Sequence, residues 1–204
     1  FRITKYLFSK TKRYSVLLFL ILVNRPKSIL EVGVYNGIRA KEMIEAAKVF
    51  NQDIRYYGFD LFEIMNEEIL SNELSKTPLK EEIVKEFLSK IGTIELYKGY
   101  SQTTLKNFNN KVDFIFIDGG HKIETIKSDW INCKKLLKKN SIVIFDDFFF
   151  NNQNLVSEFG CNKVVESISS GEYKKKHLFF RDRFINHNKK LEIGLFFVKK
   201  LLND

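Results

Sequence analysis

The sequence predicts an α/β fold, a three-layer sandwich in which helices cover both faces of a mostly parallel seven-stranded sheet. Two observations support this prediction. From residue 28 onward, short apolar runs alternate with apolar residues at helical spacing, which is typical of βαβ units. Polar or glycine residues then follow each of the first five apolar runs, as expected where parallel strands enter loops.

The five apolar runs predict the parallel strands. They are Ser28–Val34, Ile54–Asp60, Thr93–Tyr97, Val112–Asp118 and Ser141–Asp146. Between them, two stripes of apolar residues, spaced three and four apart, predict the buried faces of helices. The first stripe consists of Ala40, Met43, Ile44, Ala47 and Phe50, and the second of Ile123, Ile126, Trp130, Cys133 and Leu137.

Residues 63–91 are rich in Glu, Lys and Leu and predict a helical insertion, in which Pro78 separates two helices. The second helix carries Ile83, Val84, Phe87, Leu88 and Ile91 on one side. A further helix is expected within residues 151–169. Near the end of the chain, Tyr173–Arg181 and Leu191–Lys199 are expected to pair as a hairpin at the sheet edge, which adds an antiparallel strand.

The composition points to a single globular domain. The chain has 204 residues, 44% of them hydrophobic, which is enough for a substantial core. Its longest apolar run, Tyr14–Val23, is about half the length that spans a bilayer. Cys133 and Cys161 are too few for a disulfide framework. We therefore expect a soluble, cytoplasmic protein with reduced thiols.

The net charge of +9 is concentrated at the two ends of the chain. Residues 1–27 hold seven Lys or Arg and no acid, whereas residues 28–170 are mildly acidic. A protein that tracks a phosphate backbone should carry basic residues through its body, so nucleic-acid binding is not expected. We expect residues 1–27 to be a basic helical extension and residues 28–204 to be the main domain. The extension either packs against the sheet or contacts an anionic membrane surface.

The loop after the first strand indicates the kind of ligand. A dinucleotide fingerprint would need glycine at positions 33, 35 and 38, but the residues there are Gly33, Tyr35 and Ile38, which disfavours NAD. The segment from Glu31 to Gly37 instead resembles the E-x-G-x-x-x-G motif of class I S-adenosylmethionine-dependent methyltransferases. The resemblance covers roughly residues 28–200 and implies a Rossmann-like fold.

The resemblance also implies a set of cofactor-binding residues. Gly33 and Gly37, with Tyr35 between them, would let the backbone pass close to the amino-acid part of S-adenosylmethionine, and Glu31 would order this loop or meet the cofactor's ammonium. Asp60, at the end of the second strand, would accept hydrogen bonds from the ribose hydroxyls. Gly99 and Ser101 fall where the family contacts the adenine.

Three further carboxylates resemble the metal site of magnesium-dependent O-methyltransferases, of the catechol and macrolide-sugar types. Asp118, Asp146 and Asp147 follow two adjacent strands, and in those enzymes acids at these positions hold a divalent metal that activates the acceptor hydroxyl. His121 falls at the position of the general base. The catechol type has an amide where Asp147 stands, and metal-free relatives also keep an acid like Asp118, facing the cofactor's amino group. His121 could equally hydrogen-bond its neighbours at a helix start.

The sequence therefore predicts methyl transfer from S-adenosylmethionine to a small-molecule or sugar hydroxyl, assisted by magnesium, with His121 and Asp118 as the catalytic residues. Two alternatives stay open at this point, besides a hydroxylase-like relative with similar DGxH and DD segments but different chemistry. One is a methyltransferase that acts on RNA or protein, although no Asn-Pro-Pro-Tyr-like motif of amino-methylating enzymes follows the fourth strand. The other is a non-catalytic partner protein that keeps the same fold. The identity of the acceptor and the oligomeric state are not predicted.

Overall fold

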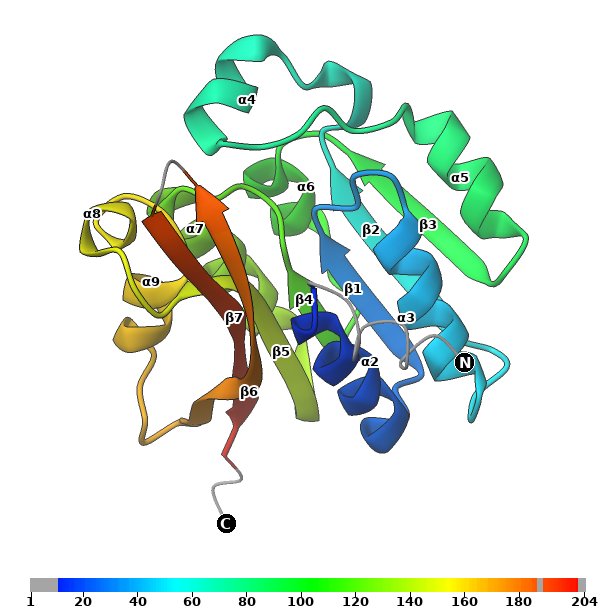
Figure 1. The fold of residues 1–204 in the computed structure, drawn as a ribbon. Coiled ribbons are helices and arrows are strands. Elements are labelled where there is room, and N and C mark those ends of the chain that lie inside the picture. Colours follow the sequence, from blue (N-terminus) through cyan, green and yellow to red (C-terminus); the bar gives the residue numbers. More distant parts are fainter. Residues whose placement is uncertain (1–10, 187–188, 202–204) are drawn as a thin grey trace.

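A computed structural model describes residues 11–186 and 189–201 of the chain (Figure 1). Its strands are β1 (Ser28–Val32), β2 (Arg55–Asp60), β3 (Thr93–Lys98), β4 (Val112–Ile117), β5 (Leu137–Phe149), β6 (Tyr173–Asn186) and β7 (Lys189–Lys200). Its helices are α2 (Arg13–Asn24), α3 (Ile38–Lys48), α4 (Glu67–Glu73), α5 (Glu81–Ser89), α6 (Ser101–Asn107), α7 (Ile123–Cys133), α8 (Gln153–Val156) and α9 (Asn162–Ser167). Short 3₁₀ turns occupy Phe62–Ile64 and Lys134–Leu136.

The seven strands form one sheet in the order β3-β2-β1-β4-β5-β7-β6. The first five pair in parallel, and β7 runs antiparallel both to β5 and to β6. This arrangement confirms the predicted mostly parallel sheet with a late antiparallel strand. Because the order reverses between β1 and β4, a crevice forms beyond the carboxyl ends of these two strands, where ligands bind in such sheets.

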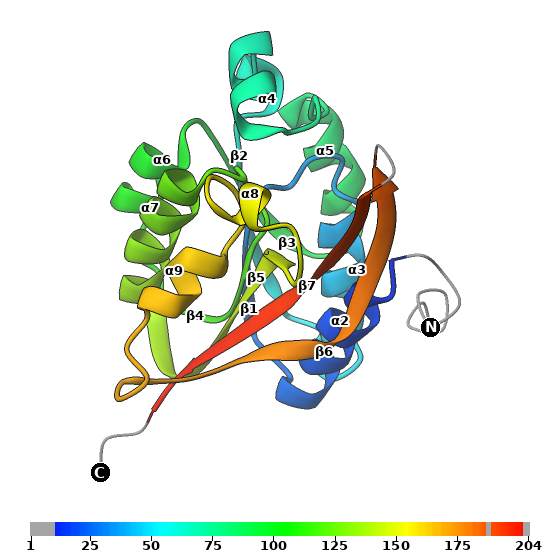
Figure 2. The same ribbon diagram turned by 60° about the vertical axis from the view of Figure 1, so that its left-hand side comes forward.

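Helices cover both faces of the sheet (Figure 2). On one face, α2, α3 and α5 bury residues such as Leu17, Met43 and Val84 against the sheet. On the other face, α6, α7 and α9 contribute residues such as Leu105 and Trp130 to a second core. Because one core packs against each face of the sheet, the central strands are buried on both sides. All five residues of β1 are therefore buried.

Several helix and strand boundaries differ from the expected ones, because exposed polar residues at the ends of an element do not show the apolar spacing on which the expectations were based. β5 begins at Leu137, which the apolar stripe had placed on the preceding helix, and its next three residues are exposed. The strand also continues past Asp146 to Phe149, after a register shift in its pairing with β7. The expected helix within 151–169 is two short helices, α8 and α9. Pro78 does separate two helices, α4 and α5, as predicted.

Two of the expected helix stripes are less buried than predicted. Phe50 lies just beyond the end of α3 and is half exposed, because the helix stops at Lys48. In α5, Val84 and Leu88 are fully buried, whereas Ile83 is half exposed. This helix covers the β3 edge of the sheet, where only a narrow stripe can reach the core.

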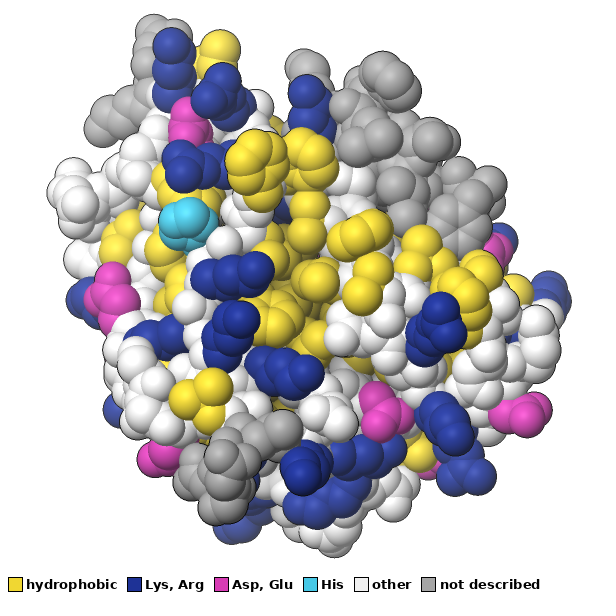
Figure 3. Space-filling view, turned by 90° about the horizontal axis from the view of Figure 1, so that it is seen from below, with side chains coloured by type: hydrophobic (Ala, Val, Ile, Leu, Met, Phe, Trp, Pro, Cys, Tyr) yellow, Lys and Arg dark blue, Asp and Glu magenta, His cyan; other side chains and the backbone are white. Residues whose placement is uncertain are grey.

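Helix α2 carries exposed apolar residues as well as buried ones. Phe19 and Val23 are more than half exposed, and Arg25 lies over the ring of the neighbouring Phe50, 4.3 Å from its centroid. Figure 3 shows the face opposite the strand carboxyl ends, where hydrophobic side chains are surrounded by Lys and Arg. Across residues 11–186 and 189–201, no helix combines the length and apolar character needed to cross a membrane. Peripheral membrane contact through this segment stays a prediction.

Candidate active site

A cavity of about 650 Å³ opens at the carboxyl ends of the parallel strands. This volume is within the usual range for small-molecule sites. Its lining includes these sequence-predicted residues: Gly33, Tyr35, Asp60, Gly99, Ser101, Asp118, His121 and Asp147. Three other predicted residues, Glu31, Gly37 and Asp146, are not part of the lining. The loop before α4, the end of α4 and the start of α2 complete the walls.

The loop after β1 passes very close to the end of β4 at Gly33. A Cβ atom built on Gly33 would lie 2.0 Å from the carbonyl oxygen of Asp118, and the φ angle of Gly33 is +91°. Its N–H donates to the carbonyl of Phe59 at the end of β2 (2.8 Å). Only glycine fits here, because both the contact and the backbone conformation exclude a side chain. Gly33 therefore lets three strand ends meet at the floor of the cavity.

Gly37 has a different role. It begins α3 with a φ angle of +74°, and a Cβ built on it would lie 3.1 Å from a methyl group of Val84 on α5. Gly37, the second glycine of the motif, therefore lets α5 of the insertion pack closely against the start of α3.

Asp60 joins the loops around the cavity. One carboxylate oxygen accepts the N–H of Tyr35 (2.7 Å), and the other accepts the N–H of Phe62 (3.1 Å). Its backbone carbonyl accepts the N–H of Gly99 (3.0 Å), at the loop after β3. Since each carboxylate oxygen can accept two hydrogen bonds, both keep acceptor capacity beyond these backbone contacts.

Glu31 lies in the middle of the sheet and is fully buried. Burial raises the pKa of its carboxyl group to about 8, although a hydrogen bond donated by the hydroxyl of Tyr56 opposes this rise. Glu31 is therefore mostly protonated at neutral pH. Glu31 does not line the cavity, and its Oε1 has no hydrogen-bond partner among the described residues.

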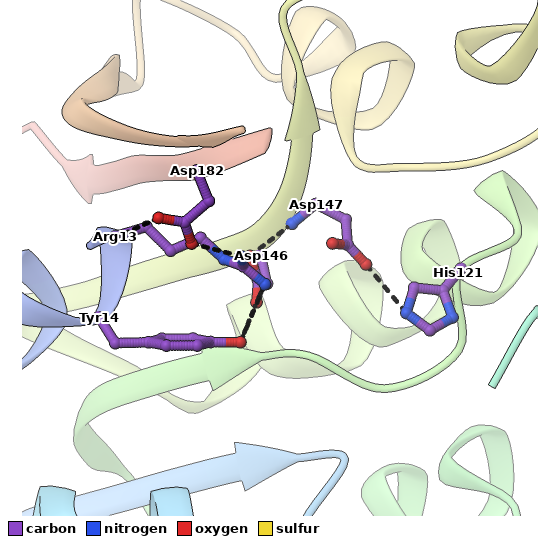
Figure 4. A network of polar contacts seen from close by, with 6 residues as sticks. All are labelled: Arg13, Tyr14, His121, Asp146, Asp147 and Asp182. Carbon is purple, nitrogen blue, oxygen red and sulfur yellow. Dashed lines mark hydrogen bonds and ion pairs between the residues drawn. The ribbon is translucent and has the colours of Figure 1, made fainter. Parts of the chain in front are cut away.

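Asp146 lies in a buried polar network that reaches the start of α2 (Figure 4). The guanidinium of Arg13 donates two hydrogen bonds to Asp146, from Nε to Oδ1 (2.8 Å) and from Nη2 to Oδ2 (3.1 Å). Its Nη1 donates to Oδ2 of Asp182 on β6 (2.6 Å). The hydroxyl of Tyr14 also donates to Asp146 (3.1 Å). Both Arg13 and Tyr14 line the cavity.

Asp147 forms an ion pair with His121, with 2.9 Å between Oδ2 and Nε2. The Nδ1 of His121 contacts the backbone carbonyl of Glu73 at the end of α4 (2.6 Å), so Nδ1 carries a proton. Burial lowers the pKa of His121, but the hydrogen bond and charge of Asp147 outweigh it and raise the pKa to about 9. His121 also holds the pKa of Asp147 below its usual value despite burial. The pair is therefore an imidazolium and a carboxylate at neutral pH.

Asp118 directly follows β4 and lies on the cavity wall. Burial raises its pKa well above the usual value, and the nearby charges of Asp146 and Asp147 raise it further. A bound cation next to Asp118 would favour its ionised form. The cavity therefore contains a carboxyl group that can match a positive charge on a ligand.

These features can be compared with known proteins. A family described as "Methyltransferase domain" matches residues 30–148, which span β1 to β5. The chain belongs to this methyltransferase family. The uncharacterized protein R132 of Acanthamoeba polyphaga mimivirus is 26% identical to this chain over 147 residues. The match includes 71% of this chain and 62% of R132, so the chain spans less than two thirds of that relative.

Solved structures share the fold of this chain at low sequence identity. An O-methyltransferase from Bacillus cereus in complex with SAH has a TM-score of 0.61 at 15% identity, over 91% of this chain and 79% of that one. The SAH-bound Podospora anserina methyltransferase PaMTH1 has a TM-score of 0.60 at 17% identity, over 96% and 80%. A candidate rRNA methylase from Clostridium thermocellum has a TM-score of 0.61 at 14% identity, over 93% and 97%. These likenesses show the fold.

The structure does not show the predicted metal site of Asp118, Asp146 and Asp147, and binding of Mg²⁺ stays a prediction. Within the described ranges, 11–186 and 189–201, no group of three or more His, Cys, Asp or Glu side chains is arranged to hold a metal ion. The physical reason is Arg13, whose guanidinium binds both oxygens of Asp146. Asp147 is in turn engaged by His121. The three carboxylates reach the same edge of the sheet, as predicted, but two of them have cationic side chains as partners.

Sequence reasoning missed the contribution of α2 to this site. Arg13 and Tyr14 belong to a segment that was expected to be an extension, and their partner Asp182 lies 169 positions after Arg13. It also missed Glu73, whose carboxylate accepts the N–H of Lys122 (2.8 Å) and the hydroxyl of Thr125 (2.6 Å). Glu73 thereby fastens α4 over the start of α7. Neither set carries a local sequence signal, because both depend on tertiary contacts.

Proposed function

We propose that this chain transfers a methyl group from S-adenosylmethionine to a hydroxyl group of a small molecule, such as a sugar. One observation carries the proposal. A single cavity is lined by the loop of Gly33 and the carboxylate of Asp60, and also by the His121–Asp147 pair. We assign the first set to the cofactor and the second set to the acceptor. The acceptor class is a proposal of ours.

The residues present fit S-adenosylmethionine. Gly33 leaves the backbone without side chains where the cofactor would pass, and Asp60 has acceptor capacity for two ribose hydroxyls. Asp118 would become ionised beside the ammonium group at the amino-acid end of the cofactor. When bound, the cofactor supplies an activated methyl group on a sulfonium centre. Gly99 and Ser101 line the remaining part of the cavity, where the adenine would lie.

His121 is the residue placed to take the acceptor's proton. Its Nδ1 is held by the carbonyl of Glu73, so proton transfer must occur at Nε2, which faces Asp147. Nε2 accepts a proton only after it has lost its own. Nε2 would take the proton of the acceptor hydroxyl as the methyl group moves from sulfur to oxygen, with the carbon–sulfur bond breaking while the carbon–oxygen bond forms. Asp147 stabilises the imidazolium that results.

A raised pKa at His121 predicts an alkaline pH dependence. Below a pKa of about 9 the imidazole is protonated, so kcat/KM should fall about tenfold for each pH unit below that value. The substitution Asp147→Asn removes the group that raises the pKa, so it should move the histidine titration toward the ordinary value of about 6.5. A proton NMR titration of the His121 ring would measure this shift directly. A His121 titration near 6.5 in the wild type would contradict the proposed pair, and His177→Ala, an exposed position, is the control.

Cofactor binding can be tested by calorimetry before any acceptor is known. We expect S-adenosylhomocysteine to bind with a micromolar dissociation constant and NAD to give no heat. Asp60→Ala should weaken binding by about tenfold to a hundredfold, because buried hydrogen bonds to a charged group contribute roughly 1.5–3 kcal/mol. The exposed Asp53→Ala, on the loop before β2, is the matched control. Absence of thioether binding would remove the proposed function and leave the fold.

Turnover separates the remaining alternatives. With labelled S-adenosylmethionine and cell extract, label should appear in small hydroxylated molecules. Label found only in RNA or protein would favour the corresponding alternative, and cofactor binding without any transfer would favour a non-catalytic partner. The mildly acidic body of the chain, residues 28–170, supports the small-molecule proposal over RNA.

A further inference from the structure

We propose that Arg13 is the resident cation of this active site, and that the site works without a divalent metal. The guanidinium, held between Asp146 and Asp182, takes the electrostatic place that a metal would have among these carboxylates. The inference rests on the proposed function only in that the reaction at this site is taken to be methyl transfer. If Arg13 has this role, helix α2 is part of the active centre.

Asp146 has no capacity left for a metal. A carboxylate offers about four lone-pair positions, and Asp146 accepts four hydrogen bonds. The donors to Oδ1 are Nε of Arg13 (2.8 Å) and the N–H of Asp147 (2.8 Å). The donors to Oδ2 are Nη2 of Arg13 (3.1 Å) and the hydroxyl of Tyr14 (3.1 Å). A metal could bind Asp146 only if it displaced the guanidinium or the hydroxyl.

Arg13 is itself held from several directions. Its side chain is 9% exposed, and those of Asp146 and Asp182 are 1% and 0% exposed. Asp182 binds it twice, through Nη1 (2.6 Å) and through the backbone N–H (3.2 Å). Nη2 also donates to the hydroxyl of Tyr14 (2.9 Å). The planar guanidinium matches a carboxylate bidentately, a geometry that lysine cannot reproduce.

The charges at this end of the cavity balance without a metal. Arg13 and protonated His121 are two positive charges, which face the carboxylates of Asp146 and Asp147 at hydrogen-bonding distance. Burial and the charges of Asp146 and Asp147 raise the pKa of Asp118, and burial raises the pKa of Asp182. Both groups therefore favour the neutral form more than an exposed aspartate does. A divalent ion would add charge to a set that is already compensated.

Manganese binding tests the inference, because Mn²⁺ is a paramagnetic probe for magnesium-type sites. We would titrate Mn²⁺ into the S-adenosylhomocysteine-saturated wild type, Arg13→Met and Arg13→Lys, and count bound ions by electron paramagnetic resonance. The wild type and Arg13→Lys should bind none below about 1 mM. Arg13→Met removes the charge but keeps a long side chain, so it should bind one Mn²⁺ per chain. Adding Asp146→Asn to Arg13→Met should abolish that Mn²⁺ binding.

Thermal melting gives a second readout. Arg13→Met leaves buried carboxylates uncompensated, so its Tm should fall by roughly 5–10 °C, and Mn²⁺ should restore part of the loss. A structural role alone would lower the Tm without any response to Mn²⁺. If Arg13→Met fails to fold, the wild type and Arg13→Lys still decide the question.

Two results would overturn the inference. One is a wild type that binds one Mn²⁺ in a manner abolished by Asp146→Asn. The other is a folded Arg13→Met protein that binds S-adenosylhomocysteine but gains no Mn²⁺. Neither measurement uses turnover, so failure of the inference is distinguishable from failure of cofactor binding.

Discussion

Replacing His121 with alanine should lower kcat by roughly 10²–10⁴-fold, the usual contribution of a positioned general base. The affinity for S-adenosylhomocysteine should change by no more than a few-fold, because His121 lies on the side of the cavity assigned to the acceptor. The measurement is the rate of S-adenosylhomocysteine release with an accepted hydroxyl compound. Calorimetry with the thioether measures binding separately.

His177→Ala is the matched control for this variant. His177 is exposed on β6 and does not line the cavity, so its replacement should leave the rate unchanged. If His121→Ala retained the wild-type rate, His121 would have no part in proton transfer and its pairing with Asp147 would be structural. Loss of thioether binding together with the rate would instead assign His121 to the cofactor side.

Gly33→Ala should abolish cofactor binding and lower the free energy of unfolding by roughly 2–6 kcal/mol. A methyl group at this position would lie 2.0 Å from the carbonyl oxygen of Asp118, and the residue would hold a φ angle of +91°. Backbone strain of this kind and overpacking each cost roughly 1–3 kcal/mol. Urea denaturation measures the loss of stability, and calorimetry with S-adenosylhomocysteine measures the loss of binding.

The control for this change is Gly171→Ala. An added Cβ there would meet only the hydroxyl of Ser169, at 3.7 Å, so stability and binding should stay within the error of measurement. A Gly33→Ala protein with wild-type stability would show that β1 and β4 can separate at this point. Cofactor binding would then have to be assigned to a more adaptable loop.

The parallel sheet and the position of the site were predictable because both follow from local patterns. Buried parallel strands such as Val112–Ile117 are apolar on both faces, so they stand out as runs. The carboxyl ends of parallel strands lie at one edge of the sheet. The clustering of Asp60, Asp118 and Asp147 could therefore be predicted without knowing the register of strand pairing. The glycine at position 33 was recognisable from its motif, although its reason, contact with Asp118, is tertiary.

The partners of the carboxylates were not predictable. Asp146 appeared in the sequence as one of two adjacent acids at a strand end, and nothing local distinguishes an acid that binds arginine from one that binds a metal. Arg13 was one of seven basic residues in a segment without acids. Its pairing depends on where β6 places Asp182, and long-range pairs of this kind leave no spacing to detect. For that reason the sequence could not distinguish an acid paired with arginine from a metal ligand.

The link between Arg13 and Asp182 has a consequence for the order of folding during synthesis. The ribosome releases the first helix early, but one of its two carboxylate partners is made 169 residues later. Until β6 emerges, a nascent chain has to keep a charged side chain beside an incomplete sheet. Distant contacts of this kind form late and slowly. The active centre should therefore be among the last parts of the molecule to assemble, and a chain stalled before residue 182 should be open to proteolysis at its first helix.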